Sequence, residues 1–466
     1  MSSPGTPEQP VRVAVVGAGP AGFFAAEALL RCLAPVFAVD LFERLPTPFG
    51  LVRSGVAPDH QKIKGVTKTF ERTAENHRFR FFGNVEIGKD LSTQELSASY
   101  HQVVYAIGSS SDRRLGIPGE ELDGSYSATA FVGWYNAHPD FRDFPFDLRS
   151  ERAVVVGVGN VAMDVARVLL KSPEQLAKTD IARHALEALR ASRLREIVLL
   201  ARRGPAEAAF DPRELQDVAE MADVSVSVDL AAVEADLAGH DELDARQKRN
   251  LELMLECARA TPSEGARTLR LEFNASPVEL LADASRHIRA VRAERTASVA
   301  QPNGRRTAKG TGHFFEIDAG IVFRSIGYRG EPLPGLPFDE GGGVIPNVDG
   351  RITGGPEADV LPGLYAVGWI RRGPYGVIGT NKADAHLVVS RMLEDVPALP
   401  ERELPPGDRL EALLEQRGVR ATSYQDWRII DTAELEQGKA TGKIREKVAS
   451  VEQMMNELLK TARPQE

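Results

Sequence analysis

The apolar positions of this chain repeat one pattern twice. A run of apolar residues ends in closely spaced glycines, and behind the glycines apolar residues recur at helical spacing. The first copy is VAVVGAGPAG at 13–22, followed by a helical pattern to Leu30. The second is AVVVGVGNVAMD at 153–164, followed by a helical pattern to Leu170. Each copy predicts a strand, a tight turn and a helix.

The glycine spacing in both copies is typical of a dinucleotide-binding turn. In such a turn the first glycine makes the tight bend, the second lets the backbone approach a pyrophosphate, and the third allows close helix packing. The phosphates then lie at the helix N-terminus, where free amides favour anions. One such turn is weak evidence in a chain with 41 glycines, whereas two are far less probable by chance. The positions are Gly17, Gly19 and Gly22, then Gly157 and Gly159, with Ala162 in the third place.

The residues after the next apolar run distinguish the two sites. Val36–Phe42 ends in Glu43, where this unit places the acid that binds a ribose hydroxyl. Glu196–Leu200 is followed instead by Arg202 and Arg203, and guanidinium groups bind a 2′-phosphate that an acid would repel. We therefore expect the second site to prefer NADP to NAD. The alternative is an ordinary crossover with a surface glutamate and two solvent-facing arginines.

The remaining pattern predicts further elements in both halves. Each half closes with an apolar strand ending in Ile-Gly, and a glycine-rich loop near the end of the chain runs into a helix. The tail has two helical stretches with no assigned chemistry. The predicted strands are Phe79–Ile87, Gln102–Gly108 and Ile321–Gly327, and the predicted helical stretches are Ser172–Ala191, a helix from near Thr380, Arg409–Gln416 and Ile444–Leu459.

Composition narrows the functional classes. The chain has 466 residues, enough for two or three domains, and its net charge of −9 argues against broad nucleic-acid binding. Cys32 and Cys257 are too few and too isolated for a disulfide framework, a Cys-based iron–sulfur cluster or a redox CxxC. No apolar run approaches the roughly 18 residues of a membrane span. The first ten residues lack the features of a secretory signal, so a cytoplasmic location is expected.

Several segments together resemble the adrenodoxin reductase family, the NADPH–ferredoxin reductases of glutathione-reductase-like fold. These segments are PTPFGLVRSGVAPDHQKIK, GVGNVAMDVARVLL, the Arg202–Arg203 pair and WIRRGPYGVIGTNK. The likeness runs from Val11 into the C-terminal tail. It implies an α/β fold with two Rossmann-like dinucleotide-binding domains. The FAD domain is discontinuous, residues 1–112 and 330–466, and the NADP domain, residues 113–329, is inserted between its parts.

The resemblance also assigns binding residues, position by position. One departure is Val158, where a polar residue is commoner in the family; the turn nevertheless binds phosphate through its backbone. The implied FAD contacts are Ala18, Glu43, Leu51, Val85, Trp369, Gly376, Val377 and Ile378, beside the turn glycines Gly17, Gly19 and Gly22. The implied NADP contacts are Arg113, Gly157, Val158, Gly159, Asn160, Val161, Arg202, Arg203, Glu214 and Gly376.

The implied reaction is that of a ferredoxin–NADP(+) reductase, EC 1.18.1 type. NADPH reduces FAD by hydride transfer, and single electrons then pass to a ferredoxin-type iron–sulfur protein that serves an acceptor such as a cytochrome P450. No metal is required. His60 and Glu214 match the pair that lies near the nicotinamide and flavin, where they either tune the redox site or form a structural pair. Arg246, Lys248 and Arg249 are candidates for ferredoxin docking, and a monomer suffices.

Rival functions remain open at this stage. Thioredoxin reductases share the fold type but need a CxxC, and flavin monooxygenases need a substrate pocket for which the sequence has no signature. Outside dedicated ferredoxin reduction, the chain could be an NADPH-binding redox sensor or a diaphorase. Turnover with an artificial acceptor separates a sensor from an enzyme.

Overall fold

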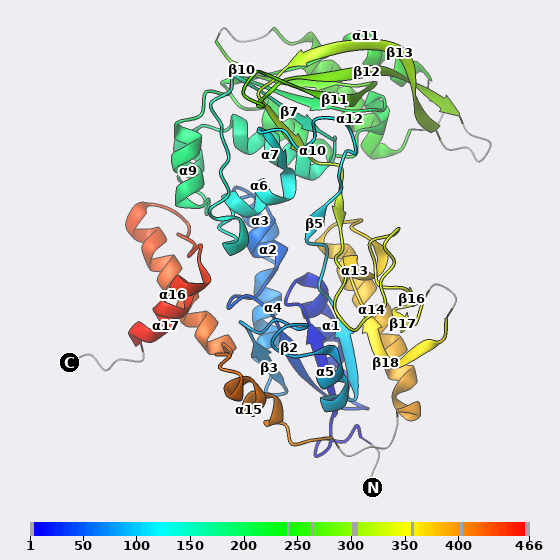
Figure 1. Ribbon diagram of the computed structural model, residues 1–466, viewed down its shortest axis with the longest axis vertical. Helices are drawn as coiled ribbons and strands as arrows, with labels where there is room; N and C mark the ends of the chain where they lie inside the picture. The colour runs from blue at the N-terminus through cyan, green and yellow to red at the C-terminus, as the bar shows by residue number, and fades with distance from the viewer. Residues whose placement is uncertain are drawn as a thin grey trace. The chain divides into compact units, whose positions relative to one another are not determined.

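The computed structural model describes residues 4–239, 243–261, 265–300, 306–355, 358–399 and 404–461. The chain divides into two compact units. Unit 1 comprises residues 1–56, 60–111 and 328–466, and unit 2 comprises residues 57–59 and 112–327. Each unit contains its own parallel sheet, as expected for an α/β fold (Figure 1).

Unit 1 is built on a seven-stranded sheet in the order β16-β17-β18-β4-β1-β2-β3. The strands from β18 to β3 run parallel, and β16 and β17 add an antiparallel edge. The strands are β1 (Val11–Val16), β2 (Phe37–Phe42), β3 (Phe79–Phe82), β4 (Gln102–Tyr105), β15 (Tyr328–Arg329), β16 (Asn347–Val348), β17 (Arg351–Thr353) and β18 (Val360–Ala366). The helices are α1 (Pro20–Leu30), α2 (Leu51–Ser54), α3 (Gln61–Lys64), α4 (Thr67–Ala74), α5 (Thr93–Ser99), α13 (Trp369–Arg372), α14 (Ile378–Asp395), η3 (Val396–Ala398), α15 (Arg409–Gln416), α16 (Tyr424–Thr441) and α17 (Val451–Thr461).

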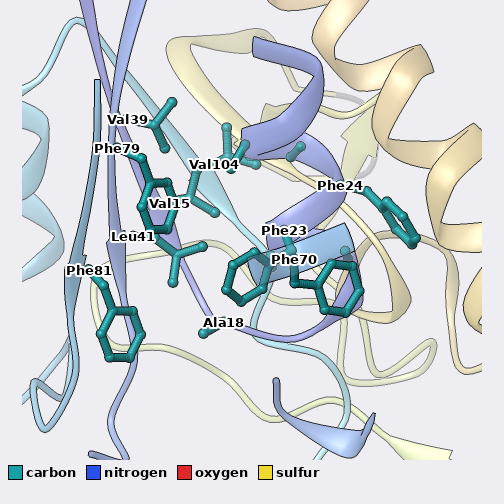
Figure 2. Close-up of a cluster of buried hydrophobic side chains, with 14 of the residues drawn as sticks. Val15, Ala18, Phe23, Phe24, Val39, Leu41, Phe70, Phe79, Phe81 and Val104 are labelled. Atoms are coloured by element: carbon teal, nitrogen blue, oxygen red, sulfur yellow. The ribbon is translucent and has the colours of Figure 1, made fainter. Parts of the chain in front are cut away.

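Aromatic packing fixes α1 on this sheet. Figure 2 shows Phe23 of α1 facing the side chains of β1 to β4, including Val15, Leu41 and Phe79. The Phe23 ring stacks on Phe70 of α4 with 4.9 Å between centroids. All five side chains are buried, so the helix that follows the first glycine turn is held by a close-packed hydrophobic core.

Unit 2 has a six-stranded parallel sheet in the order β6-β14-β7-β8-β10-β9 and a separate antiparallel sheet of β11, β12 and β13. The β12–β13 hairpin is long (Figure 1). The strands are β6 (Ser125–Ser127), β7 (Arg152–Val156), β8 (Glu196–Leu200), β9 (Val224–Val228), β10 (Arg267–Glu272), β11 (Ala275–Ala282), β12 (Ile288–Ala300), β13 (Arg306–Asp318) and β14 (Ile321–Arg324); β5 (Ser111–Asp112) spans the boundary between the units. The helices are α6 (Ala128–Tyr135), η1 (Pro139–Phe141), α7 (Asn160–Leu170), α8 (Pro173–Leu176), α9 (Arg183–Arg190), η2 (Pro205–Glu207), α10 (Pro212–Ala219), α11 (Leu230–Gly239) and α12 (Ala245–Arg259).

The structure corrects several predicted elements. The strand predicted for Phe79–Ile87 ends at Phe82, because Gly83 leaves the sheet and exchanges two backbone hydrogen bonds of 2.8 Å with Thr422. The helix expected from near Thr380 begins at Ile378, and the preceding loop contains the short helix α13. In the tail the predicted helix Ile444–Leu459 begins only at Val451, and the sequence reading missed α16 altogether.

In the described part of the chain, no helix combines the length and apolar character needed to cross a bilayer.

Candidate functional site

The first glycine turn has the geometry of a phosphate-binding turn. Gly17 has a φ of +106°, and a Cβ there would lie 2.5 Å from the carbonyl oxygen of Ala106. A Cβ on Gly22 would lie 2.0 Å from the carbonyl oxygen of Gly17. A Cβ on Gly19, in contrast, would meet none of the described atoms within 4 Å, and no described side chain caps this end of α1. The first amides of α1 therefore face open space that suits an anion.

Glu43 lies beside this turn, at the carboxyl end of β2. Its side chain accepts hydrogen bonds from the amides of Ala18 at 3.0 Å and Leu45 at 3.2 Å. The amide of Val85 donates to the Glu43 carbonyl at 2.9 Å, so three predicted FAD contacts lie together. Burial raises the pKa of Glu43, against the opposing effect of the two amides. The carboxyl is thus held within the turn, where a ribose hydroxyl is its natural partner.

Trp369 begins the short helix α13, and its indole ring carries a hydrogen-bond donor. Its indole Nε1 is buried and has no hydrogen-bond partner among the described residues. A buried donor without an acceptor is costly, so a ligand that accepts a hydrogen bond from this indole would stabilise the site. The preceding Gly368 approaches α1 so closely that a Cβ there would lie 2.6 Å from Cβ of Ala21. The open space at Gly19, the acid Glu43 and this indole all fit a bound dinucleotide.

The long helix α14 of unit 1 also has an uncapped start, at Gly376–Ile378. Gly376 has a φ of +83°, and Val377 is the N-cap residue of α14, without a capping side chain in the described chain. Val377 is 61% exposed, and Leu51, at the start of α2, is 37% exposed. Helix α14 packs along α1 (Figure 1). The positive end of α14 is therefore open to a ligand.

The second glycine turn repeats the geometry of the first within unit 2. Gly157 has a φ of +126°, and a Cβ there would lie 2.2 Å from the carbonyl oxygen of Ser325. Gly159 is the N-cap residue of α7, and a Cβ on it would meet none of the described atoms within 4 Å. The described residues supply no side-chain cap there. The turn is closed by backbone on one side and open in front of the helix.

The other turn residues are engaged by the protein itself. The Val158 carbonyl accepts a hydrogen bond of 2.9 Å from the Ala209 amide. Asn160 uses its side-chain oxygen to accept from the Asp211 amide at 2.7 Å. Val161 lies half-buried in the first turn of α7. A phosphate at this turn would therefore be bound by backbone amides, so an apolar side chain at Val158 would not weaken its binding.

The arginine pair at the end of β8 is unequal. Both side chains are exposed, but Arg203 forms an ion pair of 3.2 Å with Glu207, whereas Arg202 has no ion pair within the described residues. Thr296 anchors the backbone of Arg202 by donating to its carbonyl at 2.7 Å. Arg113, also exposed, donates its amide to the Gly327 carbonyl at 3.1 Å. Arg202 thus carries the less neutralised guanidinium of the pair.

Glu214 belongs to a buried charge network in unit 2 that the sequence reading missed. At its centre lies the guanidinium of Arg167, with a side chain only 1% exposed. It pairs with Asp59 at 2.9 Å, with Asp164 at 2.5 Å, and with Glu214. Lys171 adds an ion pair of 2.8 Å to Asp59. An arginine inside the apolar run of α7 was the only signal in the sequence.

Three carboxylates and two cations thus lie together in this network. Burial, followed by the charge of Asp164, raises the pKa of Glu214 to about 7, although Arg167 opposes the rise. Burial also works against ionisation of Asp59, but Arg167 and Lys171 overcome it and hold the pKa of Asp59 well below its usual range. Glu214 is therefore the residue of this network whose raised pKa lies near neutral pH.

Two predicted residues belong to unit 1, whereas this network belongs to unit 2. His60 is half-buried at the N-cap position of α3, and it belongs to unit 1. Gly376, predicted to contact both cofactors, also belongs to unit 1. The pairing of His60 with Glu214 and the double role of Gly376 stay predictions.

The predicted docking residues all lie exposed on α12. Arg249 forms ion pairs of 3.4 Å and 3.5 Å with Glu252 and Glu256. Arg246 donates to the carbonyl of Ala208 at 3.3 Å. For Lys248, no ion pair exists within the described residues. Local acids thus reduce the positive charge of this cluster.

Comparison with known proteins agrees with this geometry. The chain is 45% identical over 462 residues to a Mycobacterium tuberculosis protein named NADPH-ferredoxin reductase FprA, covering 96% of this chain and 99% of that protein. It is 41% identical over 465 residues to the human mitochondrial NADPH:adrenodoxin oxidoreductase, covering 97% and 92%. The solved structure of Mycobacterium tuberculosis FprA in complex with NADPH superposes with a TM-score of 0.91 at 44% identity, covering 97% of this chain and all of that one. These relatives confirm the resemblance to adrenodoxin reductases. The family model described as pyridine nucleotide-disulphide oxidoreductase matches residues 11–379, and the chain belongs to that family.

Proposed function

We propose that this protein is an FAD-dependent NADPH–ferredoxin oxidoreductase. The observation that carries the proposal is the presence of two uncapped, open glycine turns on two separate parallel sheets. The first is followed by Glu43 and the second by Arg202 and Arg203. That difference matches a ribose-binding acid in an FAD site and a 2′-phosphate site for NADPH. Relatives of nearly full length carry the names NADPH-ferredoxin reductase and NADPH:adrenodoxin oxidoreductase.

In unit 1, the chain's own groups bind and orient the flavin nucleotide. The amides at the start of α1 receive the pyrophosphate, Glu43 receives a ribose hydroxyl, and Trp369 donates through its free indole. When bound, FAD accepts a hydride equivalent from NADPH and delivers single electrons to an iron–sulfur partner. The open N-terminus of α14 offers partial positive charge to the end of the ring system that gains negative charge on reduction.

In unit 2, the amides around Gly159 bind the pyrophosphate of NADPH, and Arg202 binds the 2′-phosphate. Arg202 contributes more than Arg203, because Glu207 already neutralises part of the charge of Arg203. Arg113 and Val161 complete the proposed NADP set.

His60 and Glu214 tune the redox site in this proposal and are not obligatory acid and base, because hydride transfer requires no proton at the same atom. Protonation of Glu214 sets the charge of the Arg167 network near neutral pH. Replacement of either residue by alanine slows flavin reduction without abolishing it. Complete loss of reduction in a variant that still binds FAD would contradict the tuning role. The alternative is that His60 and Glu214 have only a structural role, in which case their replacement would leave the rate of flavin reduction unchanged.

Turnover separates the reductase from its alternatives. A reductase reduces ferricyanide rapidly with NADPH and transfers electrons to an added ferredoxin at a comparable rate. A diaphorase reduces ferricyanide but gives no faster transfer to ferredoxin than to a non-partner protein, and a redox sensor turns over neither acceptor quickly. We also propose that the protein is cytoplasmic and monomeric, as expected from the sequence. Light scattering of the protein as it elutes from a size-exclusion column tests the monomeric state.

A further inference from the structure

The C-terminal segment, which had no assigned chemistry, supplies a fully buried carboxylate to unit 1. Glu434 of α16 has a side chain with 0% exposure. Its two oxygens accept from both terminal nitrogens of Arg53, at 2.9 Å and 2.5 Å. They also accept from Arg445 at 2.8 Å and from the amide of Val448 at 2.8 Å. Four donors therefore fix this carboxylate, and the same cations hold the pKa of Glu434 below its usual value despite burial.

The tail holds Arg53 by more than this ion pair. The guanidinium carbon of Arg53 lies 5.1 Å from the ring centroid of Trp427, also on α16. Lys447 donates its ammonium group to the Arg53 carbonyl at 2.9 Å. Both the side chain and the main chain of Arg53 are thus bound by the tail, and Arg53 lies on the four-residue helix α2. A helix this short has no stability of its own, so these contacts decide where it lies.

The residues before α2 form a constrained wall against the first glycine turn. Phe49 has a φ of +84°, in the left-handed region that disfavours a bulky side chain. Its amide donates to the carbonyl of Ala18 at 2.9 Å, and its ring meets Trp427 edge-on with 5.8 Å between centroids. The next residue, Gly50, approaches so closely that a Cβ on it would lie 2.9 Å from Cα of Gly19. The strained backbone of Phe49 persists only where the surrounding residues enforce it. The tail contributes Trp427 to these surroundings.

We infer that Glu434 is a positioning residue for the flavin site: by fixing Arg53 it holds Phe49 and Gly50 against the Gly19 turn where the pyrophosphate binds. The inference rests on the proposed function, because it takes unit 1 as the FAD domain. Removing the negative charge of Glu434 leaves the buried Arg53 without a counter-charge, whereas Arg445 keeps its ion pair of 2.6 Å with Asp431. Arg53 then moves toward solvent, and the wall at Phe49 relaxes away from the turn.

The test is the rate at which the holoenzyme releases FAD after dilution, followed by the fluorescence of free flavin. Glu434→Gln preserves shape and removes the charge, and Arg53→Met removes the partner. Each is expected to release FAD at least tenfold faster than wild type. The release rate of the double variant is expected to lie within threefold of the rates of the single variants, because both substitutions remove the same ion pair. Arg53→Lys keeps the positive charge but loses the two-pronged geometry, so its rate of FAD release must lie between those of Arg53→Met and wild type. This variant also tests the inference if Glu434→Gln does not fold.

The matched control is Glu95→Gln. Glu95 forms a similar two-pronged ion pair, with Arg417 of the tail at 2.6 Å and 3.1 Å, but on α5. Its loss is expected to change flavin release less than twofold. Wild-type release rates in Glu434→Gln or Arg53→Lys, even with a lowered melting temperature, would overturn the positioning role and leave the proposed function intact. Equal acceleration in Glu95→Gln would also overturn it. A wild-type protein that carries no flavin would overturn the proposed function first, and the inference with it.

Discussion

Gly159 offers a sharp test of the second nucleotide site, because alanine there fits the protein but not the nucleotide. The residue has φ −99° and ψ 179°, which any residue adopts, and its Cβ would meet none of the described atoms within 4 Å. Alanine is worse than glycine at an N-cap by about 1 kcal/mol. The reduced freedom of the unfolded chain returns about 0.4–1 kcal/mol. The folded protein is therefore expected to keep nearly its wild-type stability.

The methyl group of Gly159→Ala would occupy the space in which a pyrophosphate approaches the amides of α7. Losing one hydrogen bond to a charged group costs about 1.5–3 kcal/mol. At about 1.4 kcal/mol per factor of ten, the KM for NADPH rises about 10- to 150-fold. The flavin content, read from the ratio of flavin to protein absorbance, stays at the wild-type value because Gly159 lies in unit 2.

The matched control for Gly159→Ala is Gly157→Ala in the same turn. Gly157 has a φ of +126°, and its Cβ would lie 2.2 Å from the carbonyl of Ser325. Backbone strain of about 1–3 kcal/mol and overpacking of about 1–3 kcal/mol should lower the melting temperature markedly. A wild-type KM for NADPH in folded Gly159→Ala would refute the placement of the pyrophosphate. Loss of flavin from Gly159→Ala would refute the separation of the two sites.

Four further predictions concern charged groups. Arg202→Ala should raise the KM for NADPH at least tenfold more than the KM for NADH, and Arg203→Ala should have the same effect to a smaller extent. Steady-state assays with both nucleotides measure this preference. Equal effects on the two KM values would contradict the assignment. In Glu214→Gln, the pH dependence of flavin reduction near pH 7 should disappear in stopped-flow traces, and a surviving transition would assign the proton elsewhere. Relative to Glu214→Gln, the wild type should be most stable below about pH 4.5 and lose stability as the pH rises toward 7, because its folded-state pKa is raised; urea unfolding at several pH values measures this, and the opposite slope would contradict the raised pKa. Arg249→Glu should slow ferredoxin reduction at low salt several-fold and leave ferricyanide reduction unchanged, and no change at low salt would remove the α12 cluster as the docking site.

Local patterns were sufficient to predict several strands of the two parallel sheets and the two glycine turns. Glycine spacing after an apolar run has few structural solutions, so Gly17 and Gly157 fall at tight bends with positive φ, as the sequence indicated. The strand Glu196–Leu200 and the helix Arg409–Gln416 also have the predicted bounds. The resemblance added residues such as Trp369 that no periodicity singles out.

Long-range pairing was what the sequence did not reveal. Helix α16 carries Glu434 on its buried face, and a charged residue there breaks the apolar periodicity by which a helix is recognised. The charge is tolerated because Arg53, 381 positions earlier, pairs with it, together with Arg445. Arg167 was missed for the same reason, since its partner Asp59 is 108 positions away. Buried ion pairs of this kind become visible only once the fold brings the partners together.

The most direct test of the proposed reductase activity is an anaerobic absorbance titration of the purified protein with NADPH and, separately, with NADH. We expect a yellow protein whose flavin band bleaches near one equivalent of NADPH and only at much higher concentrations of NADH. A colourless protein, a flavin band that NADPH does not bleach, or equal bleaching by both nucleotides would contradict the proposal.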